Sequence, residues 1–267
     1  SKQVNPGERY PFWWVVFLVL LNLAITLPLS WYLSIWIDEA YSLNTTAGTL
    51  AHTLHQTLRF EHQSPLYFCL LNLWRGLHES IFFARLFSVL CITTVLCLCP
   101  GLSKRYLPCF HPGWLIACVA LNPFVISCAI DVRVYALALL QSAVLLWTFH
   151  DGFLASTSKR SSRDIFTVFA VLSLYTHYYT GFLLLTCGIT LLVLGRWSAL
   201  RAYTLRMMVT ALLFSPLLPL LSEQFSAHNP DQIIPMTRRD ITLFLPNRIL
   251  GFLAPTDWSD EISRIAR

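Results

Sequence analysis

Several groups of ionisable and polar side chains interrupt an otherwise apolar chain, and they are the residues able to do chemistry. The first is the adjacent acidic pair Asp38-Glu39, which follows a long hydrophobic run. Asp131 and Arg133 stand between two further apolar runs, close to Tyr135. A carboxylate can act as a general base, and an arginine can hold a phosphate through its fork of donors. The pattern therefore predicts acid–base chemistry or anion binding.

Imidazole and phenol groups mark two more places where the apolar pattern breaks. His177 and Tyr178 stand between two later apolar runs, and Glu61 and His62 directly precede Ser64-Pro65. We interpret them as further members of a polar ring around one site. Plain structural alternatives exist for each group: solvated carboxylates at a helix end, an ion pair joining two helix ends, or tyrosines of an interfacial belt.

The histidines of one stretch offer a metal site as an alternative. His52, His55 and His62, with Glu61, carry the ligand types that suit transition ions. No HExxH or comparable spacing connects them. We therefore expect no definite cofactor, keep a divalent metal ion as the weaker alternative, and interpret the histidines as polar loop residues.

The composition is that of a membrane protein. The chain has 267 residues, of which 55% are hydrophobic and only 12% charged, whereas an ordinary soluble domain is about a quarter charged. A bilayer core of about 30 Å takes roughly 20 apolar residues per helix, so we expect one all-α domain, a polytopic bundle of about seven transmembrane helices. The candidate spans are Phe12 to Trp36, Ala84 to Cys99, Trp114 to Ile130, Tyr135 to Phe149, Ile165 to Tyr175, Gly181 to Leu194 and Leu205 to Leu221.

The positive charges lie where topology signals lie. In an alternating topology they share one side, which the positive-inside rule assigns to the cytoplasm. They are Lys2, Arg9, Lys104, Arg105, Lys159, Arg160, Arg163, Arg196, Arg201 and Arg206. Asp38, Asp131 and His177 then share the periplasmic or lumenal face of a bacterial inner membrane or an ER-type membrane. The net charge of +5 thus reflects topology, and we expect no nucleic-acid partner.

The first outer loop, residues 37–83, is expected to hold two interfacial helices. Apolar residues at helical spacing between Ala47 and Leu58 predict the first. Ser64-Pro65 is a good helix start and predicts a second from Leu66 to Arg75. A crossing helix over Leu66 to Leu77 would reverse the sides of the basic loops, which the charge pattern disfavours. Residues 1–222 then form the membrane module, and residues 223–267 an outer-face loop or the start of a C-terminal region.

The position of the acidic pair is unusual for that topology. Asp38-Glu39 is expected at the carboxyl end of the first span, where negative charge opposes the helix macrodipole. Some other group should therefore hold these carboxylates in place.

Taken in order, these segments resemble the GT-C superfamily of polyprenyl-phosphate-sugar-dependent glycosyltransferases, especially the group with protein O-mannosyltransferases and the lipid A aminoarabinose transferase. The resemblance lies in residues 36–42 (WIDEAYS), 62–67 (HQSPLY), 84–88 (ARLFS), 131–137 (DVRVYAL) and 176–179 (THYY). Their order and spacing are more specific than any one of them. The chain has Ser64-Pro65 where the family often has Pro-Pro, and Asp131 where it often has Glu.

The resemblance implies seven transmembrane helices with two juxtamembrane helices in the first outer loop. It also implies a sugar donor linked to polyprenyl phosphate, inverting transfer to a glycan, lipid or protein acceptor, and Asp38 as general base. Glu39 would orient Asp38 or bind the acceptor, and Arg133 would hold the leaving phosphate. The remaining substrate-binding candidates are Asp131, Tyr135, His177, Tyr178, His62, Glu61 and Arg85.

Other functions remain open. Outer-face charges around a membrane cavity can also serve a lipid or sugar transporter or flippase, and a GT-C-like chain can be a non-catalytic scaffold. Family members usually continue with further helices and often a soluble outer domain, so we expect another subunit as a candidate partner for acceptor recognition, beside the membrane lipids.

Overall fold

The computed structural model describes residues 12–59 and 63–219, and these residues form a helical protein without a strand. The prediction of an all-α fold is confirmed for this part of the chain. Its α-helices are α1 Phe12–Tyr32, α2 Ile37–Thr45, α3 Leu50–Arg59, α4 Leu66–Arg75, α5 Ile81–Tyr106, α6 Pro112–Ala120, α7 Pro123–Ile130, α8 Tyr135–Phe149, α9 Arg160–Thr176, α10 Thr180–Val193 and α11 Trp197–Phe214. Two short turns, His150–Leu154 and Ser215–Leu217, extend α8 and α11.

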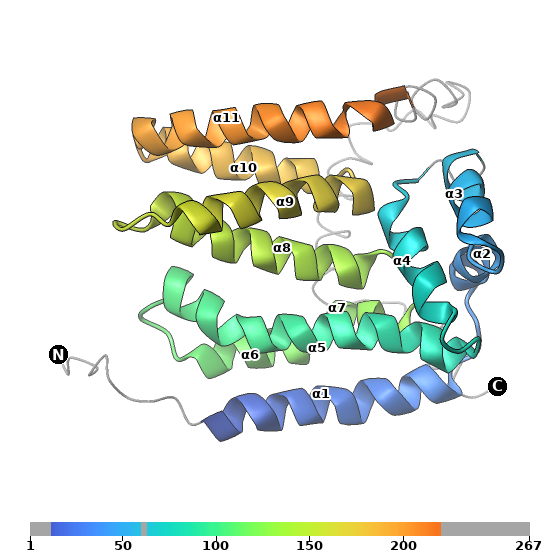
Figure 1. Ribbon diagram of the computed structural model, residues 1–267. Coiled ribbons are helices and arrows are strands. Elements are labelled where there is room, and N and C mark those ends of the chain that lie inside the picture. Colours follow the sequence, from blue (N-terminus) through green and yellow to red (C-terminus); the bar gives the residue numbers. More distant parts are fainter. Residues whose placement is uncertain (1–11, 60–62, 220–267) are drawn as a thin grey trace, which may run out of the picture.

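The long helices lie side by side, and the three short helices α2, α3 and α4 cover one end of them (Figure 1). Helix α5 packs against α1, α6, α7 and α8, while α8 packs against α9, and α9 against α11. We call the end that carries α2–α4 the site end. The opposite end, with the connections at residues 107–111, 155–159 and 194–196, is called the basic end.

Three helical segments are long and apolar enough to cross a membrane: Trp13–Tyr32, Ile81–Tyr106 and Tyr135–Leu154. A fourth span results if α6 and α7 count as one. Three to four spans result, and not the seven of the sequence prediction. Helix α10 has only 14 residues, α9 carries polar residues over its first turns, and α11 contains Arg201 and Arg206. The seven-helix module thus remains an expectation.

The third predicted span is broken. Helices α6 and α7 meet at an angle of 57°, where the sequence prediction had one continuous helix from Trp114 to Ile130. Asn122 caps α7 by accepting hydrogen bonds from the N–H groups of Phe124 and Val125, and Pro123 takes the first helical position. An Asn-Pro pair is a strong helix start, which is why a new helix begins here.

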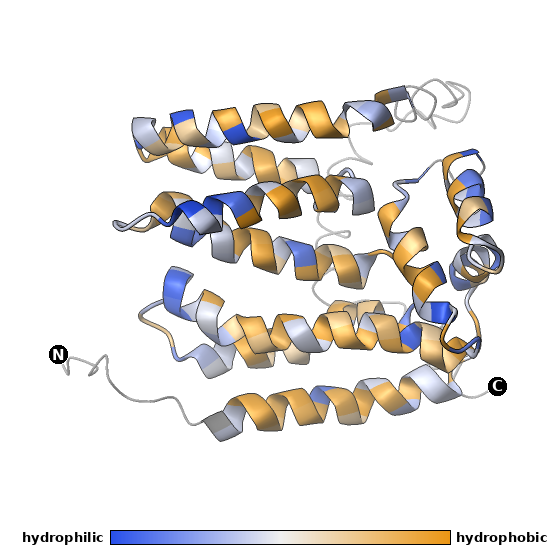
Figure 2. Ribbon diagram, viewed as in Figure 1, coloured by the Kyte–Doolittle hydropathy of each residue, from blue (hydrophilic) through white to orange (hydrophobic). Residues whose placement is uncertain are grey.

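Hydrophobic residues make up most of the length of the long helices (Figure 2). Large hydrophobic residues that are more than half exposed occur on several helices, among them Leu20, Leu90, Phe182, Leu185, Met208 and Leu212. Soluble proteins rarely expose contiguous apolar surface on this scale. The exposed apolar surface suits lipid contact.

The short helices of the first outer loop agree in part with the sequence prediction. Helix α4 runs over the predicted residues Leu66–Arg75, and α3 covers Leu50–Arg59. Thr53 and Thr57 form the buried face of α3, while its leucines Leu50 and Leu54 are 44% and 41% exposed. The apolar side of α3 therefore faces away from the protein, as expected of a helix lying on a membrane surface.

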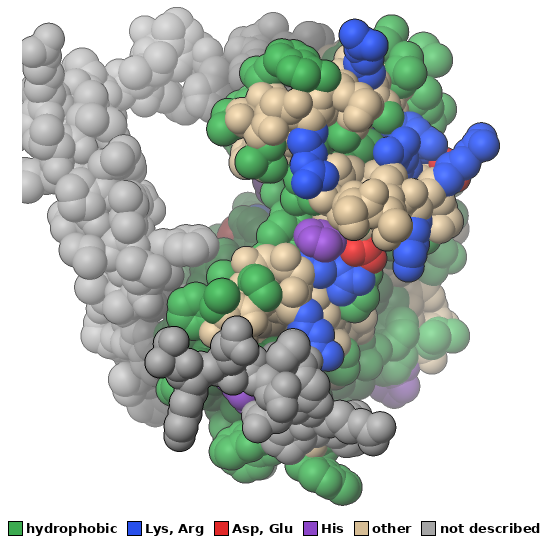
Figure 3. All heavy atoms as spheres, turned by 90° about the vertical axis from the view of Figure 1, so that its left-hand side faces the viewer, with side chains coloured by type: hydrophobic (Ala, Val, Ile, Leu, Met, Phe, Trp, Pro, Cys, Tyr) green, Lys and Arg blue, Asp and Glu red, His purple; other side chains and the backbone are tan. Residues whose placement is uncertain are grey.

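The two ends differ in charge. Within the described residues, the site end carries as many acids as bases: Asp38, Glu39, Glu79 and Asp131 with Arg59, Arg75, Arg85 and Arg133. The basic end carries Lys104, Arg105, Lys159, Arg160, Arg163, Arg196, Arg201 and Arg206 with only Asp151 and Asp164. Figure 3 looks onto this end and shows the Lys and Arg side chains gathered there. The predicted sharing of one side by the basic connections is confirmed for the described residues.

Candidate functional site

The acidic pair lies at the beginning of a helix and not at the end of one. The long first helix stops at Tyr32, and α2 starts at Ile37, so Asp38 and Glu39 occupy the first turn of α2. The sequence prediction, which placed them at a helix carboxyl end, was wrong. Negative charge at a helix amino terminus is favourable. The Glu39 carboxylate also accepts a hydrogen bond of 3.1 Å from the backbone N–H of Trp36.

Glu39 is buried in an ion pair with Arg85 of α5. Its side chain is 1% exposed, and Arg85 donates to both carboxylate oxygens, with Nε at 2.9 Å and Nη2 at 2.6 Å. The backbone N–H of Val132 donates to the same carboxylate at 3.0 Å. Charge-assisted bidentate pairs of this kind are strong and directional. One carboxylate thus joins α2, α5 and the connection between α7 and α8.

Arg85 uses all of its donors inside the protein. Besides Glu39, its guanidinium donates to the carbonyl oxygens of Ser30, Leu33 and Ser34 at 2.8 to 3.1 Å. These carbonyls lie at and just beyond the end of α1, where helix carbonyls lack partners of their own. An arginine has five N–H groups, and all five are occupied here. The structure therefore favours a positioning role for Arg85 over the predicted contact with substrate.

Asp38 and Arg133 form a second, more open pair. Arg133 Nη2 lies 3.7 Å from Asp38 Oδ2, and the two side chains are 19% and 48% exposed respectively. Arg133 Nη1 also lies 3.5 Å from the Asp38 carbonyl oxygen. The predicted juxtaposition of residues 38 and 133, from segments far apart in the chain, is confirmed. Unlike the buried pair, both groups keep access to a ligand.

The buried pair positions the open one through backbone neighbours. Glu39 adjoins Asp38 in the first turn of α2, and it binds the N–H of Val132, the residue before Arg133. The hydroxyl of Ser88 donates to the Asp131 carbonyl oxygen at 2.7 Å. Both contacts fix the segment that carries Arg133. The half-buried Asp131 itself stands at the carboxyl end of α7.

Aromatic side chains lie beside Arg133. Its guanidinium carbon is 5.7 Å from the ring centre of Tyr135, and the rings of Tyr135 and His177 are 6.2 Å apart. His177 continues into Tyr178 and Tyr179, at ring distances of 5.8 and 5.2 Å. Burial, and to a lesser degree the charge of Arg133, lowers the pKa of His177. The structure thus brings Asp38, Arg133, Tyr135, His177 and Tyr178 to one region.

Tyr67 of α4 belongs to the same region, although it was not among the predicted site residues. Its side chain is fully buried, and burial raises the pKa of its hydroxyl, while Arg133 opposes that shift and Glu39 and Asp131 add to it. Within the described residues its hydroxyl has no hydrogen-bond partner. A buried, unpaired hydroxyl is costly. The sequence hint was its place at the end of the segment 62–67.

The histidines of the alternative metal site are placed only in part. His52 and His55 are exposed on α3, and Glu61 and His62 lie outside the described residues. Over residues 12–59 and 63–219, no group of three or more His, Cys, Asp or Glu side chains is arranged to hold a metal ion.

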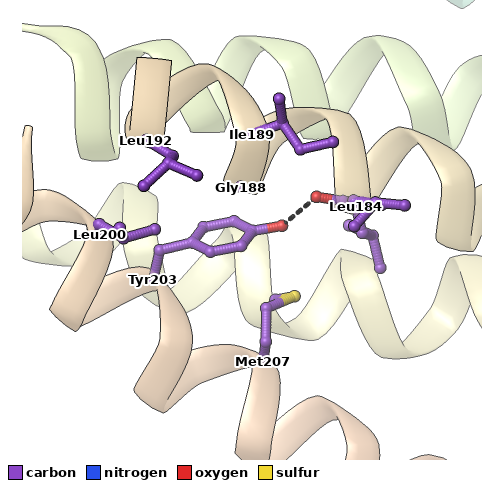
Figure 4. A pocket seen from close by; sticks show the side chains of 8 residues that line it. Leu184, Gly188, Ile189, Leu192, Leu200, Tyr203 and Met207 are labelled. Atoms are coloured by element: carbon purple, nitrogen blue, oxygen red, sulfur yellow. Dashed lines mark hydrogen bonds between the residues drawn. The ribbon is translucent and has the colours of Figure 1, made fainter. Parts of the chain in front are cut away.

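A separate apolar groove of about 340 Å³ lies between α10 and α11 (Figure 4). Its lining is Leu184, Leu185, Gly188, Ile189, Leu192, Leu200, Tyr203 and Met207. The only hydroxyl in this lining, that of Tyr203, donates to the carbonyl oxygen of Leu184. The groove therefore offers surface for an apolar chain and no group for acid–base chemistry.

Of the arrangements described above, the open pair of Asp38 and Arg133 is the one suited to catalysis. A half-exposed carboxylate can accept a proton from a bound hydroxyl, and the neighbouring guanidinium can stabilise a developing phosphate charge. No known family, curated protein or solved structure gives a significant match to this chain.

Proposed function

We propose that this chain is a membrane glycosyltransferase that moves a sugar from a polyprenyl-phosphate donor to an acceptor hydroxyl or amine at the site end. The observation that carries the proposal is the Asp38–Arg133 pair, a half-exposed carboxylate 3.7 Å from a half-buried guanidinium. This pair sits at the end of helices long and apolar enough to cross a bilayer. Support also comes from the order of the segments that resemble the GT-C superfamily.

The proposed reaction uses each member of the pair once. Asp38 accepts the proton of the acceptor group as the acceptor atom attacks the anomeric carbon of the sugar. The bond from that carbon to the phosphate oxygen breaks, and the electron pair leaves with the phosphate. Arg133 offsets the charge that builds on the leaving phosphate. A single displacement of this kind inverts the anomeric centre.

Glu39 and Arg85 act as positioning residues in this mechanism. Neither is open to a substrate, because Glu39 is 1% exposed and every N–H of Arg85 is bound within the protein. Small displacements of catalytic groups can lower rates strongly. The three backbone segments that meet at Glu39 therefore determine whether Asp38 and Arg133 face the same substrate.

The donor fits the placement of the pair. Its polyprenyl tail lies in the bilayer, and its phosphate and sugar lie at the surface, where Arg133 and the rings of Tyr135 and His177 are found. The site end has balanced charge within the described residues and the opposite end is basic. By the positive-inside rule, the site end then faces the periplasm or lumen.

A flippase or transporter is the second candidate, and the break between α6 and α7 is the observation that favours it. Transporters often bind their cargo at discontinuous helices, and these two helices are bent by 57°. The pair Asp38–Arg133 lies at the end of the bundle and is not formed by the break. Movement of a fluorescent polyprenyl-phosphate sugar across liposomes, without chemical turnover, would favour this candidate.

The test is transfer of labelled sugar from a panel of polyprenyl-phosphate donors to a panel of acceptors by the purified chain. Asp38→Asn and Arg133→Ala are compared with Glu79→Gln and Arg59→Ala, which change exposed charges at the same end. We expect turnover to fall about 10²- to 10⁴-fold in Asp38→Asn and about 10²- to 10³-fold in Arg133→Ala. The two control variants should keep normal turnover. Full activity of Asp38→Asn would refute the assignment of the base.

A further inference from the structure

A basic pocket lies at the opposite end of the molecule from the Asp38–Arg133 pair. It has a volume of about 510 Å³ and is lined by Ser158, Arg160, Arg163, Ala202, Leu205 and Arg206. Three guanidinium groups from two helices, α9 and α11, thus share one concave surface. Arginine is the residue that best recognises phosphate, because its donors match the phosphate oxygens in pairs.

Two of these arginines are held in place by the protein. Arg163 Nε donates to the Gly152 carbonyl oxygen at 2.8 Å, and its guanidinium carbon lies 5.4 Å from the ring centre of Phe153. Arg206 Nη1 donates to Asp164 and to Thr167. Donors that are already oriented lose less entropy when a ligand binds. The pocket is therefore a partly preorganised anion site.

Two of the three pocket arginines, Arg160 and Arg163, are not paired with a nearby acid among the described residues. Asp164 is paired with Arg206, and Asp151 is paired with Arg105 at 2.7 Å. Among the described residues no carboxylate contacts Arg160 or Arg163 within ion-pair distance. An anionic ligand would supply the missing negative charge beside Arg160 and Arg163.

Beside the arginines and Ser158, the lining is apolar, and its apolar part continues along α11. Ala202 and Leu205 complete the pocket, and Leu205 is 65% exposed. The next outward-facing residues of the same helix, Met208, Val209 and Leu212, are also exposed. A ligand with a phosphate at one end and an acyl chain at the other would contact both parts. A small soluble anion would use only the arginines.

We propose that this pocket binds the phosphate head group of an anionic phospholipid in the leaflet at the basic end. Basic pockets between helices on the cytoplasmic side are suited to such lipids. The bound lipid would add to the contacts that already join α9 to α11, which include the Arg206 hydrogen bonds to Asp164 and Thr167 and the packing of Phe166 against Tyr203. The inference depends on the membrane placement and not on catalysis at Asp38.

The experiment measures the thermal unfolding midpoint of the full chain in detergent micelles under three conditions. The micelles contain dioleoyl phosphatidylglycerol or dioleoyl phosphatidylcholine, or they contain no lipid and the buffer contains inorganic phosphate. Arg160→Gln is the main variant, because Arg160 lines the pocket and is exposed. Arg201→Gln is the matched control, since it removes an exposed arginine from α11 outside the pocket lining. Native mass spectrometry of the same samples counts the retained lipids.

We expect phosphatidylglycerol alone to raise the midpoint of the wild type and of Arg201→Gln. The concentration needed for half of this shift should be about fivefold higher in Arg160→Gln, from one lost arginine contact near the membrane surface. An equal response to phosphatidylcholine, or an equal loss in Arg201→Gln, would overturn the proposal. A rise of the unfolding midpoint with inorganic phosphate as large as that with phosphatidylglycerol would also contradict the proposal, because the pocket would then bind any anion. Asp38→Asn should respond as the wild type does, so this test and the turnover test fail independently.

Discussion

Asp38 and Glu39 are neighbours in one helical turn and yet occupy opposite environments. Glu39 is 1% exposed and paired with Arg85 at 2.6 Å, whereas Asp38 is 48% exposed and lies 3.7 Å from Arg133. Successive helix residues point about 100° apart, so one faces the interior while the other faces the surface. A buried carboxylate whose hydrogen-bond partners are all supplied by the protein stabilises the fold. A carboxylate that a substrate can reach can take part in catalysis.

The largest effect on stability is expected when the buried pair of Glu39 and Arg85 is broken and the open pair is left intact. Glu39→Gln removes the negative charge and leaves the Arg85 guanidinium buried without compensation. We expect the free energy of unfolding to fall by about 3–5 kcal/mol. The measurement is denaturant titration in detergent micelles, with Glu79→Gln as the control that changes an exposed carboxylate of the same kind. A loss below about 1 kcal/mol would mean that Glu39 is hydrated or repartnered.

Replacing both members of the buried pair sharpens the comparison. Glu39→Met with Arg85→Met removes both buried charges, and apolar replacement of a whole buried pair is far less costly than loss of one partner. We expect the double variant to recover about 2 kcal/mol of the unfolding free energy lost in Glu39→Gln. Turnover should nevertheless stay low, because Trp36 and Val132 lose the acceptor that holds Asp38 and Arg133 together. Recovery of both stability and turnover would contradict the positioning role.

The sequence was informative where a local pattern determines the structure. The ends of α4 at Leu66 and Arg75 agree with the prediction, although Ser64 does not cap the helix: its hydroxyl donates to the Leu174 carbonyl oxygen instead. The ends of α8 at Tyr135 and Phe149 also agree, because polar residues bound that apolar run. The meeting of residues 38 and 133 followed from topology, since both lie at the same end of neighbouring helices.

The sequence was less informative where tertiary contacts decide. Hydropathy alone continues the first span to Trp36, and only the burial of Glu39 against Arg85 shows why a new helix starts at Ile37. The position of Arg85 within an apolar run is equally consistent with a contact to a ligand and with a structural ion pair. The partners of its five N–H groups, the Glu39 carboxylate and three carbonyl oxygens at the end of α1, cannot be derived from spacing. The Asn122-Pro123 pair is a local signal for a new helix, but the apolar residues on both sides of it favoured one continuous span.

The next effect concerns the open pair. Arg133→Lys keeps the positive charge and removes the paired donors that match a phosphate. We expect turnover to fall about tenfold, equivalent to about 1.4 kcal/mol of activation free energy, with stability unchanged. Steady-state kinetics with the donor varied measures this, and Arg59→Lys serves as the exposed control. Unchanged turnover would show that charge alone suffices at this position.

A smaller effect, also at the open pair, is expected on the pKa of the neighbouring His177. Burial and the charge of Arg133 lower the pKa of His177 in the folded state, below the value of about 6.5 expected when unfolded. Its contribution to stability is therefore complete above about pH 6.5 and is lost as the pH falls. Arg133→Gln removes the smaller cause, so the pKa of His177 should rise and acid should destabilise the variant less. NMR titration of labelled histidine measures the shift, with His177→Gln to assign the signal.

The smallest expected effect completes the contrast between the two neighbouring carboxylates. Asp38→Asn makes the same chemical change as Glu39→Gln, but Asp38 is half exposed and its partner lies at 3.7 Å. Ion pairs of this kind contribute about 0–1 kcal/mol, so the free energy of unfolding should change by no more than that. Denaturant titration beside Glu39→Gln makes the comparison direct. A loss as large as that of Glu39→Gln would mean that Asp38 holds the fold, and its effect on turnover could then no longer be assigned to proton transfer.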